Sequence, residues 1–205
     1  MSNQVGANFS SADPLFDEAR FIERAQAGDL EAFDRLVIRH QQQVFAVSLR
    51  MLGNDEEAKD IAQEVFIRAY RAIGTFRHDA KFSTWVIAIT LNLCRNRRRW
   101  WARRRRFIVT SLEAPRDTEE GTRIQEVADP TPGPAVAMER REKREQLLKT
   151  LQMLEEPFRN VVVLRDLQGY SYEEIAQMLG IRAGTVKSRL NRARWQLKAL
   201  LDGKL

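Results

Sequence analysis

Residues 171–194 carry the pattern of two short helices joined by a tight turn, and this pattern constrains the fold more than any other part of the chain. Ser171 is suited to cap the first helix, with Glu174 three residues later as its capping-box partner. Gly180 stands where that helix must end, in a left-handed conformation that glycine adopts readily. The segment is therefore predicted to form a helix-turn-helix.

The second helix of this pair is predicted to begin near Thr185 and to expose a cationic face. Its apolar residues recur at helical spacing and would be buried: Val186, Leu190, Ala193 and Leu197. Between residues 175 and 201 there is no Asp or Glu, whereas six residues are basic. A surface helix stabilised by ion pairs within itself would contain both acidic and basic residues. A helix whose charges are all positive is suited to lie in the major groove of DNA. The alternative is an ordinary basic helical hairpin.

Composition excludes several classes of protein. The chain has 205 residues, of which 43% are hydrophobic, so it can bury one or two modest cores. Its longest apolar run, residues 85–94, is too short to span a bilayer, and the start of the chain does not resemble a signal peptide. We therefore expect a cytoplasmic protein with no membrane insertion.

Metal and cofactor chemistry is not expected. Cys94 is the single cysteine and is accompanied only by His40 and His78, which is no credible zinc set. No phosphate-binding glycine loop and no nucleophile with a base is evident, so the chain is not expected to be an enzyme or to hold a cofactor. The net charge of +6 favours a polyanionic partner but does not distinguish DNA, RNA or an anionic membrane.

The chain is predicted to be all-α, with two small helical domains joined by a flexible acidic, proline-containing linker. We expect a disordered tail over residues 1–13, a first domain over 14–108, a linker over 109–134 and a second domain over 135–205. The linker contains four of the six prolines and six acidic residues against two basic ones. Its 26 residues could stretch to about 85 Å, so the two domains could bind distant parts of a partner.

The last helix of the first domain is predicted to end in an arginine run. Residues 95–106 include eight arginines, no acid, and the pair Trp100 and Trp101. Such a run is expected to follow phosphates and to stack on nucleic acid, the alternative being a membrane surface. The arginines expected to contact phosphates are Arg95, Arg98, Arg99 and Arg103.

Four segments together resemble a known family. They are residues 60–70 (DIAQEVFIRAY), 76–85 (FRHDAKFSTW), 169–176 (GYSYEEIA) and 184–190 (GTVKSRL). In this order, and with a linker between them, they resemble bacterial RNA polymerase sigma factors of the extracytoplasmic-function (ECF) subfamily. The resemblance covers nearly everything except the tail and the linker. It implies sigma domains 2 and 4, and a protein that binds core RNA polymerase and directs promoter-specific initiation.

The resemblance also implies the protein interfaces. The helix over residues 55–73 would dock on the clamp coiled coil of the largest polymerase subunit, and the second domain would contact the flap of the second-largest subunit. The clamp-binding residues would be Asp60, Gln63, Glu64, Arg68 and Tyr70. An outward stripe of polar and aromatic side chains suits a partner helix, although on its own it would equally be a solvated face. An anti-sigma factor acting in a stress or envelope response is the implied regulator.

The DNA contacts implied by the resemblance fall in both domains. The minus-ten element would be recognised and melted by Phe76, Arg77, His78, Asp79, Ala80, Lys81, Asn92 and Asn96. The loop would capture a flipped base, and the two asparagines lie one helical turn apart, where amides can pair with base edges. Trp85 is expected in the core beneath the loop.

The minus-thirty-five element would be recognised by the second domain. Its implied contacts are Arg165, Tyr172, Glu173, Lys187, Ser188, Asn191 and Arg192. Lys and Arg can contact guanine or phosphate, and Glu can accept a hydrogen bond from cytosine.

Other functions are weighed against this one. A response regulator is excluded because residues 15–106 lack alternating strands and helices. An anti-sigma or other helical interaction module would not need a cationic recognition helix. A stand-alone helix-turn-helix regulator and a basic RNA-binding protein are the remaining alternatives, and transcription with core polymerase separates them from a sigma factor.

Overall fold

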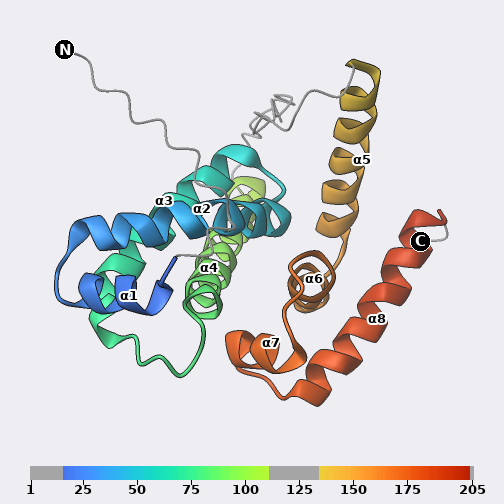
Figure 1. Cartoon of the computed structure of the whole chain (residues 1–205). Helices are drawn as coiled ribbons and strands as arrows, with labels where there is room; N and C mark the ends of the chain where they lie inside the picture. Colours follow the sequence, from blue (N-terminus) through green and yellow to red (C-terminus); the bar gives the residue numbers. More distant parts are fainter. Residues whose placement is uncertain (1–15, 111–133, 204–205) are drawn as a thin grey trace, which may run out of the picture.

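The computed structural model describes residues 16–110 and 134–203, and within these ranges the chain forms helices joined by turns and loops, with no strand (Figure 1). The N-terminal half contains α1 (Glu18–Gln26), α2 (Leu30–Leu52), α3 (Asp55–Ala72), the short turn η1 (Ile73–Thr75) and α4 (Phe82–Thr110). The C-terminal half contains α5 (Pro134–Met153), α6 (Glu156–Val162), the π turn η2 (Val163–Leu167), α7 (Tyr172–Leu179) and α8 (Ala183–Leu201). The all-α prediction is confirmed. The predicted tail and all but the ends of the linker lie outside the described residues, and α4 continues two residues past the predicted start of the linker.

Side-chain caps set the helix boundaries, as local sequence predicts. Asp29 accepts a hydrogen bond from the Ala32 amide at 3.1 Å, and Asn54 caps α3 in the same way. Ser171 and Glu174 form the complete capping box of α7, with reciprocal backbone contacts at 3.1 and 2.8 Å. Gly180 ends α7 at φ 63°.

The N-terminal half is a bundle in which α2 packs against α1, α3 and α4. Leu36, Val44 and Val47 of α2 are fully buried, as their spacing predicts. Leu30, which the same periodicity places in the core, is 61% exposed. It is the first residue of α2, and burial of this helix begins only at Ala32.

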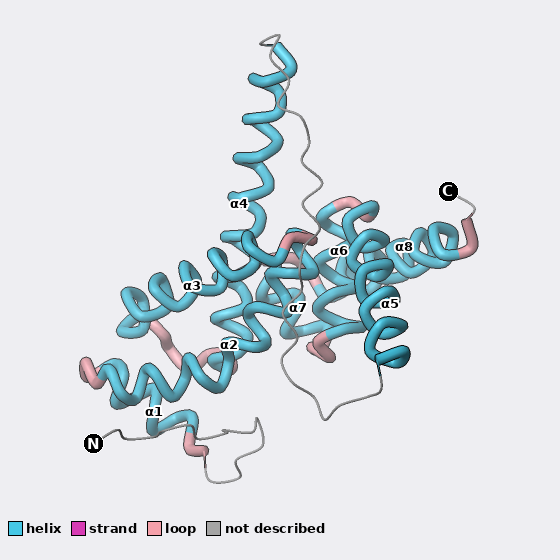
Figure 2. Tube along the Cα trace, turned by 90° about the horizontal axis from the view of Figure 1, so that it is seen from above, coloured by secondary structure: helices cyan, strands magenta, loops and turns pink. Residues whose placement is uncertain are grey.

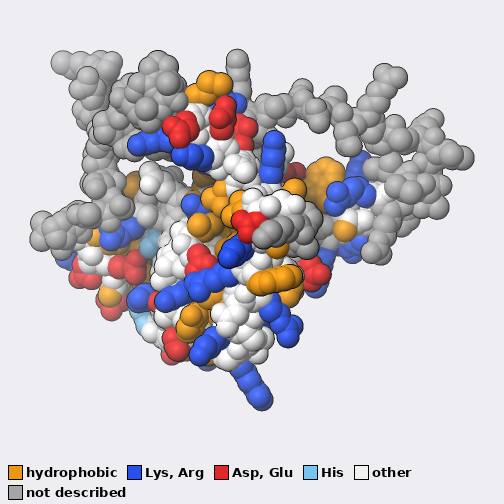
Figure 3. All heavy atoms as spheres, turned by 90° about the vertical axis from the view of Figure 1, so that its right-hand side faces the viewer, with side chains coloured by type: hydrophobic (Ala, Val, Ile, Leu, Met, Phe, Trp, Pro, Cys, Tyr) orange, Lys and Arg blue, Asp and Glu red, His pale blue; other side chains and the backbone are white. Residues whose placement is uncertain are grey.

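In the C-terminal half, α8 packs against both α6 and α7, while α5 reaches back to α2. Val161, Ile175 and Leu190 supply fully buried side chains from three successive helices. On the face shown in Figure 3, Lys and Arg side chains are distributed among acidic and hydrophobic ones. The helix-turn-helix thus has its own apolar support and a largely polar exterior.

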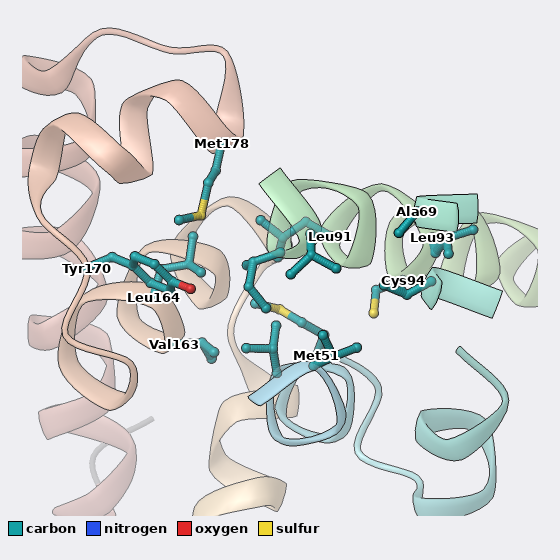
Figure 4. Packing of buried hydrophobic residues seen from close by; sticks show 14 of the residues in the cluster. Met51, Ala69, Leu91, Leu93, Cys94, Val163, Leu164, Tyr170 and Met178 are labelled. Carbon is teal, nitrogen blue, oxygen red and sulfur yellow. The ribbon is translucent and has the colours of Figure 1, made fainter. Parts of the chain in front are cut away.

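The two halves share one hydrophobic core. Met51 of α2 and Leu91 of α4 lie opposite Leu164, Tyr170 and Met178 of the C-terminal half (Figure 4). A smaller cluster brings Leu148 of α5 against residues of α2 and α3. The domains that the linker could separate are therefore packed together in this structure.

A buried arginine crosses the junction between the halves. Arg159 of α6 is 1% exposed. Its guanidinium donates to the carbonyls of Leu151, Gln152 and Leu154 at 2.7–2.9 Å, and to the Met51 carbonyl of α2 at 2.9 Å. Carbonyls near a helix C-terminus lack helical partners and carry partial negative charge, so they suit a cation.

Replacing Arg159 with Met is expected to lower the free energy of unfolding by about 3–5 kcal/mol, because several buried carbonyls lose a charged donor. Urea denaturation followed by circular dichroism measures the change. Arg192→Met, on an exposed residue, is the matched control and should stay within about 0.5 kcal/mol of the parent. Equal stability of the two variants would show that the buried guanidinium does not stabilise the fold.

Candidate nucleic-acid interface

The predicted recognition helix is α8, and its outward face is cationic. Lys187, Ser188, Asn191 and Arg192 are all exposed, whereas Val186, Leu190 and Ala193 on the opposite side are buried. The helix begins at Ala183, two residues before the predicted start. The structure thus brings the four α8 residues of the predicted site together on one surface.

An ion pair links α8 to the preceding π-helix, and a second set of contacts lies within the elements beside it. Arg194 of α8 donates a hydrogen bond to the Asp166 side chain of η2 at 3.0 Å. Arg165 lies with its guanidinium 4.9 Å from the Tyr172 ring centroid and donates to the Tyr170 carbonyl at 2.8 Å. Arg165 and Tyr172 are half-buried, so they support the helix-turn-helix as well as standing beside its surface, while Glu173 is exposed.

The loop between η1 and α4 rests on an aromatic cluster. Phe76 is buried, with its ring centroid 4.9 Å from His78, 5.3 Å from Trp85 and 5.9 Å from Phe82. Arg77, His78 and Asp79 are exposed above it. His78 has a φ of 59°, a left-handed conformation that a non-glycine residue rarely adopts. Such strain is common where a loop is shaped for a ligand.

A cavity of about 300 Å³ opens between this loop and α4. The loop supplies Phe76, Arg77, Asp79 and Ala80, and α4 supplies Trp85. Trp85 lies beneath the loop as predicted, but it is only half-buried because one side of it forms a wall of this cavity. The cavity has aromatic walls and a charged rim.

Asn92 and Asn96 are exposed on α4, yet neither of them lines the loop cavity. Asn96 instead lines a separate groove of about 400 Å³ between α3 and the arginine-rich end of α4, together with Trp100 and Arg103. The predicted minus-ten residues are thus divided. The loop cavity is lined by Phe76, Arg77, Asp79 and Ala80, the groove is lined by Asn96, and neither is lined by His78, Lys81 or Asn92.

The arginine run divides into a packed and a projecting part. The end of α4 extends away from the rest of the molecule (Figure 2), and Arg99 and Arg103 are exposed along it. Arg104 lies over the Trp100 ring at 5.3 Å from its centroid. Arg95 and Arg98, by contrast, are half-buried near the body and already bind groups of the C-terminal half.

The predicted protein-binding stripe lies on the outer side of α3. Asp60, Gln63, Arg68 and Tyr70 are exposed, and Glu64 is half-buried and paired with Arg68. Ile67, which the sequence prediction omitted, is 52% exposed in the middle of this stripe. Its spacing of three and four residues from Glu64 and Gln63 is the signal that would have included it.

Two family models match the chain. "Sigma-70 region 2" matches residues 36–106, and "Sigma-70, region 4" matches residues 144–197. The chain is also 37% identical over 184 residues to the ECF RNA polymerase sigma-E factor of Escherichia coli strain K12, covering 89% of this chain and 93% of that protein. The chain belongs to the ECF sigma factors. It is accordingly a promoter-directing subunit that acts with RNA polymerase.

Solved structures share the fold of this sigma factor. CnrH, in complex with the cytosolic domain of CnrY, matches with a TM-score of 0.64 at 26% identity, covering 92% of this chain and 99% of that one. The sigma factor RpoE of Bartonella quintana, in complex with the anti-sigma factor NepR, matches with a TM-score of 0.64 at 21% identity, covering 84% and 98%. The second likeness concerns the fold alone. Among the helices within residues 16–110 and 134–203, none is long and apolar enough to cross a membrane.

The projecting arginines generate a test of the phosphate contacts. Replacing Arg103, Arg104 and Arg105 together with Ala should reduce the salt dependence of duplex binding, by roughly one unit of log–log slope for each phosphate that the variant no longer neutralises. Fluorescence anisotropy at several salt concentrations measures the slope. A variant with Arg140, Arg141 and Arg144 of α5 replaced by Ala removes the same charge and should keep the original slope. An unchanged slope in the α4 variant would show that Arg103, Arg104 and Arg105 do not neutralise phosphates.

Proposed function

We propose that the two halves of this sigma factor divide promoter recognition between them, with residues 135–205 binding the minus-thirty-five element and residues 14–108 opening the minus-ten element. The upstream contact is assigned to α8. Its exposed face combines Lys187 and Arg192, which suit guanine or phosphate, with Ser188 and Asn191, which can donate and accept. Arg165, Tyr172 and Glu173 flank this face and complete the proposed duplex site.

The loop cavity is the proposed site for a flipped base of the non-template strand. Its aromatic walls, Phe76 and Trp85, suit the face of a base, and the rim residues Arg77 and Asp79 can hydrogen-bond its edge. Unstacking a base costs a few kcal/mol, which such contacts offset. The proposal rests on the presence of this aromatic cavity in the same chain as a recognition helix whose exposed charges are all positive.

The stripe on α3 is the proposed docking site for the clamp coiled coil of the largest polymerase subunit. Ile67 gives this surface an apolar centre flanked by Gln63, Glu64 and Arg68, the arrangement of an interface with a polar rim. In the C-terminal half, Trp195 is 68% exposed and Leu201 62% exposed. These apolar side chains support docking of the flap of the second-largest subunit.

An anti-sigma factor is the proposed regulator. The solved relatives CnrH and RpoE were both seen with a second protein, named an anti-sigma factor in the case of RpoE. A partner that covered the α3 stripe and the α8 face would block polymerase and DNA together.

Transcription with purified components tests the proposal. Core RNA polymerase plus this chain should yield run-off transcripts that sequencing maps to defined start sites, and neither component alone should yield them. A stand-alone regulator or an RNA-binding protein would give no such transcripts. Absence of specific transcripts at saturating concentrations of the chain would contradict the proposed function.

Asn191→Ala is expected to relax promoter preference at one position of the minus-thirty-five element, because one base-edge contact contributes about 1–3 kcal/mol of discrimination. Holoenzyme binding to a duplex library randomised at that element measures the preference. Lys198→Ala, on an exposed side chain of the same helix, should leave the preference unchanged. If Asn191→Ala weakens all sequences equally, Asn191 contacts only phosphate or solvent.

Ile67→Glu is expected to weaken binding of core polymerase at least about tenfold, since it places a charge at the apolar centre of the proposed interface. Competition against a labelled sigma factor for core enzyme measures the affinity. Ile38→Glu introduces the same change on α2, where Ile38 is 41% exposed, and should bind normally. Equal binding of core polymerase by both variants would show that the interface does not include the centre of the α3 stripe.

A further inference from the structure

One side of α4 connects the loop cavity to the groove beside α3. Trp85 forms a wall of the loop cavity, whereas Asn96 and Trp100 line the groove. Asn92 lies between them along the helix and is exposed. These four residues are spaced by seven, four and four positions, so they share one side of the helix. The cavity and the groove are therefore joined by a stripe of aromatic and amide side chains.

The groove has an apolar floor, an aromatic wall and an excess of positive charge. Its volume of about 400 Å³ is within the range of pockets that hold small ligands. Ile61 and Leu93, which are 1% and 3% exposed, form the floor, and Trp100, which is 44% exposed, forms a wall. Three arginines and one glutamate supply the charges: Arg68, Arg97, Arg103 and Glu64. This lining suits an anionic ligand that has a flat ring.

One of the three arginines is available to such a ligand. Arg68 and Arg97 each pair with a glutamate of α3. Arg103 is exposed and forms no ion pair with the described part of the chain, and its Nε donates to a carbonyl of its own helix at 3.4 Å. Arg103 follows Trp100 by three positions, so the two side chains lie on one face of α4. Together they suit the phosphate and the base of a nucleotide.

The Trp100 ring is held by its neighbours. The Arg104 guanidinium lies 5.3 Å from its centroid, and the Trp101 ring meets it edge-on at 4.8 Å. A ring with a fixed orientation loses little conformational freedom when a ligand stacks on it. Asn96, one helical turn away in the same groove, has an amide that can donate to and accept from a base edge. The groove thus offers a stacking contact and an edge contact to the same base.

We propose that this groove holds a second unstacked base of the non-template strand, with Trp100 stacking on the base, Asn96 bonding its edge and Arg103 binding phosphate. This inference rests on the proposed function, because it extends the path of the strand that the loop cavity captures. Trp85 and Trp100 are fifteen residues apart, which is about 22 Å along the helix. A stacked strand covers that distance with about six or seven nucleotides at roughly 3.4 Å each, and an extended strand needs fewer.

Removal of single bases tests the number and spacing of the captured bases. The probe is a single-stranded oligonucleotide that carries a minus-ten element mapped by run-off transcription, with one abasic site at a time. Wild-type holoenzyme should lose affinity about fivefold or more at two positions that lie within about seven nucleotides of each other, because an abasic site cannot stack on an aromatic ring. A single sensitive position would overturn the second site.

Trp100→Ala assigns one of these positions to the groove. The variant holoenzyme should bind the intact oligonucleotide about fivefold or more weakly and should become insensitive to base removal at one of the two positions only. Trp100→Phe keeps an aromatic face and should keep both sensitive positions. Trp101→Ala is the matched control and should behave as wild type, since Trp101 is 40% exposed on the same helix but does not line the groove. An unchanged pattern in Trp100→Ala would show that no base stacks in the groove.

Competition for core polymerase separates a DNA contact from a protein contact, because Glu64 and Arg68 of the groove also belong to the α3 stripe. Trp100→Ala should compete for core enzyme as well as the wild-type chain does. Weaker competition together with an unchanged abasic pattern would assign the groove to the polymerase interface and overturn the proposal.

Run-off transcription by the wild-type holoenzyme separates this inference from the function on which it rests. If transcripts begin at defined sites and Trp100→Ala leaves the abasic pattern unchanged, only the second base site fails. If no specific transcripts form, the proposed function itself is refuted.

Discussion

The arrangement of the two halves depends on a buried guanidinium. A charge removed from water is costly unless hydrogen bonds compensate for it, and Arg159 obtains four from main-chain carbonyls. Three of these come from the end of α5 and the turn after it, and the fourth comes from Met51 near the end of α2. The same cation therefore fixes the angle between α5 and α6 and ties the C-terminal half to the N-terminal one. The core beneath α7, and with it the position of the helix-turn-helix over the loop, is built on this junction.

Local features of the fold could be predicted because neighbouring residues determine them. The capping box of Ser171 and Glu174 and the left-handed Gly180 fix the ends of α7 wherever that helix lies. Periodicity likewise predicted most of the buried faces of α2 and α8. It failed at Leu30, where the helix begins before its packing does, and Leu197 near the end of α8 is only half-buried. Local rules are least reliable at element ends, because burial there depends on neighbouring elements.

The junction between the halves could not be predicted, because its partners are distant in sequence. In a chain this basic, Arg159 resembles any surface arginine, and no spacing links it to Met51. Arg95 and Arg98 were predicted as phosphate contacts from charge alone, and charge does not reveal the acceptors that α5 and α6 bring to them. Ile67 was missed for a different reason: its spacing places it on the α3 stripe, but only its exposure shows that an apolar side chain stands at the surface there.

The polar contacts of the junction pair cations of the N-terminal half with carboxylates of the C-terminal half. Glu174 and Glu156 place carboxylates against Lys81 and Arg95, two residues that were predicted to contact DNA. Lys81 in turn contributes to a lowered pKa of Glu174, after the larger effect of the Ser171 backbone amide, so the carboxylate stays charged near neutral pH. These pairs lie at the edge of an apolar junction that includes Leu148 and Met178. Burial of that apolar surface stabilises the contact between the halves more than the exposed ion pairs do.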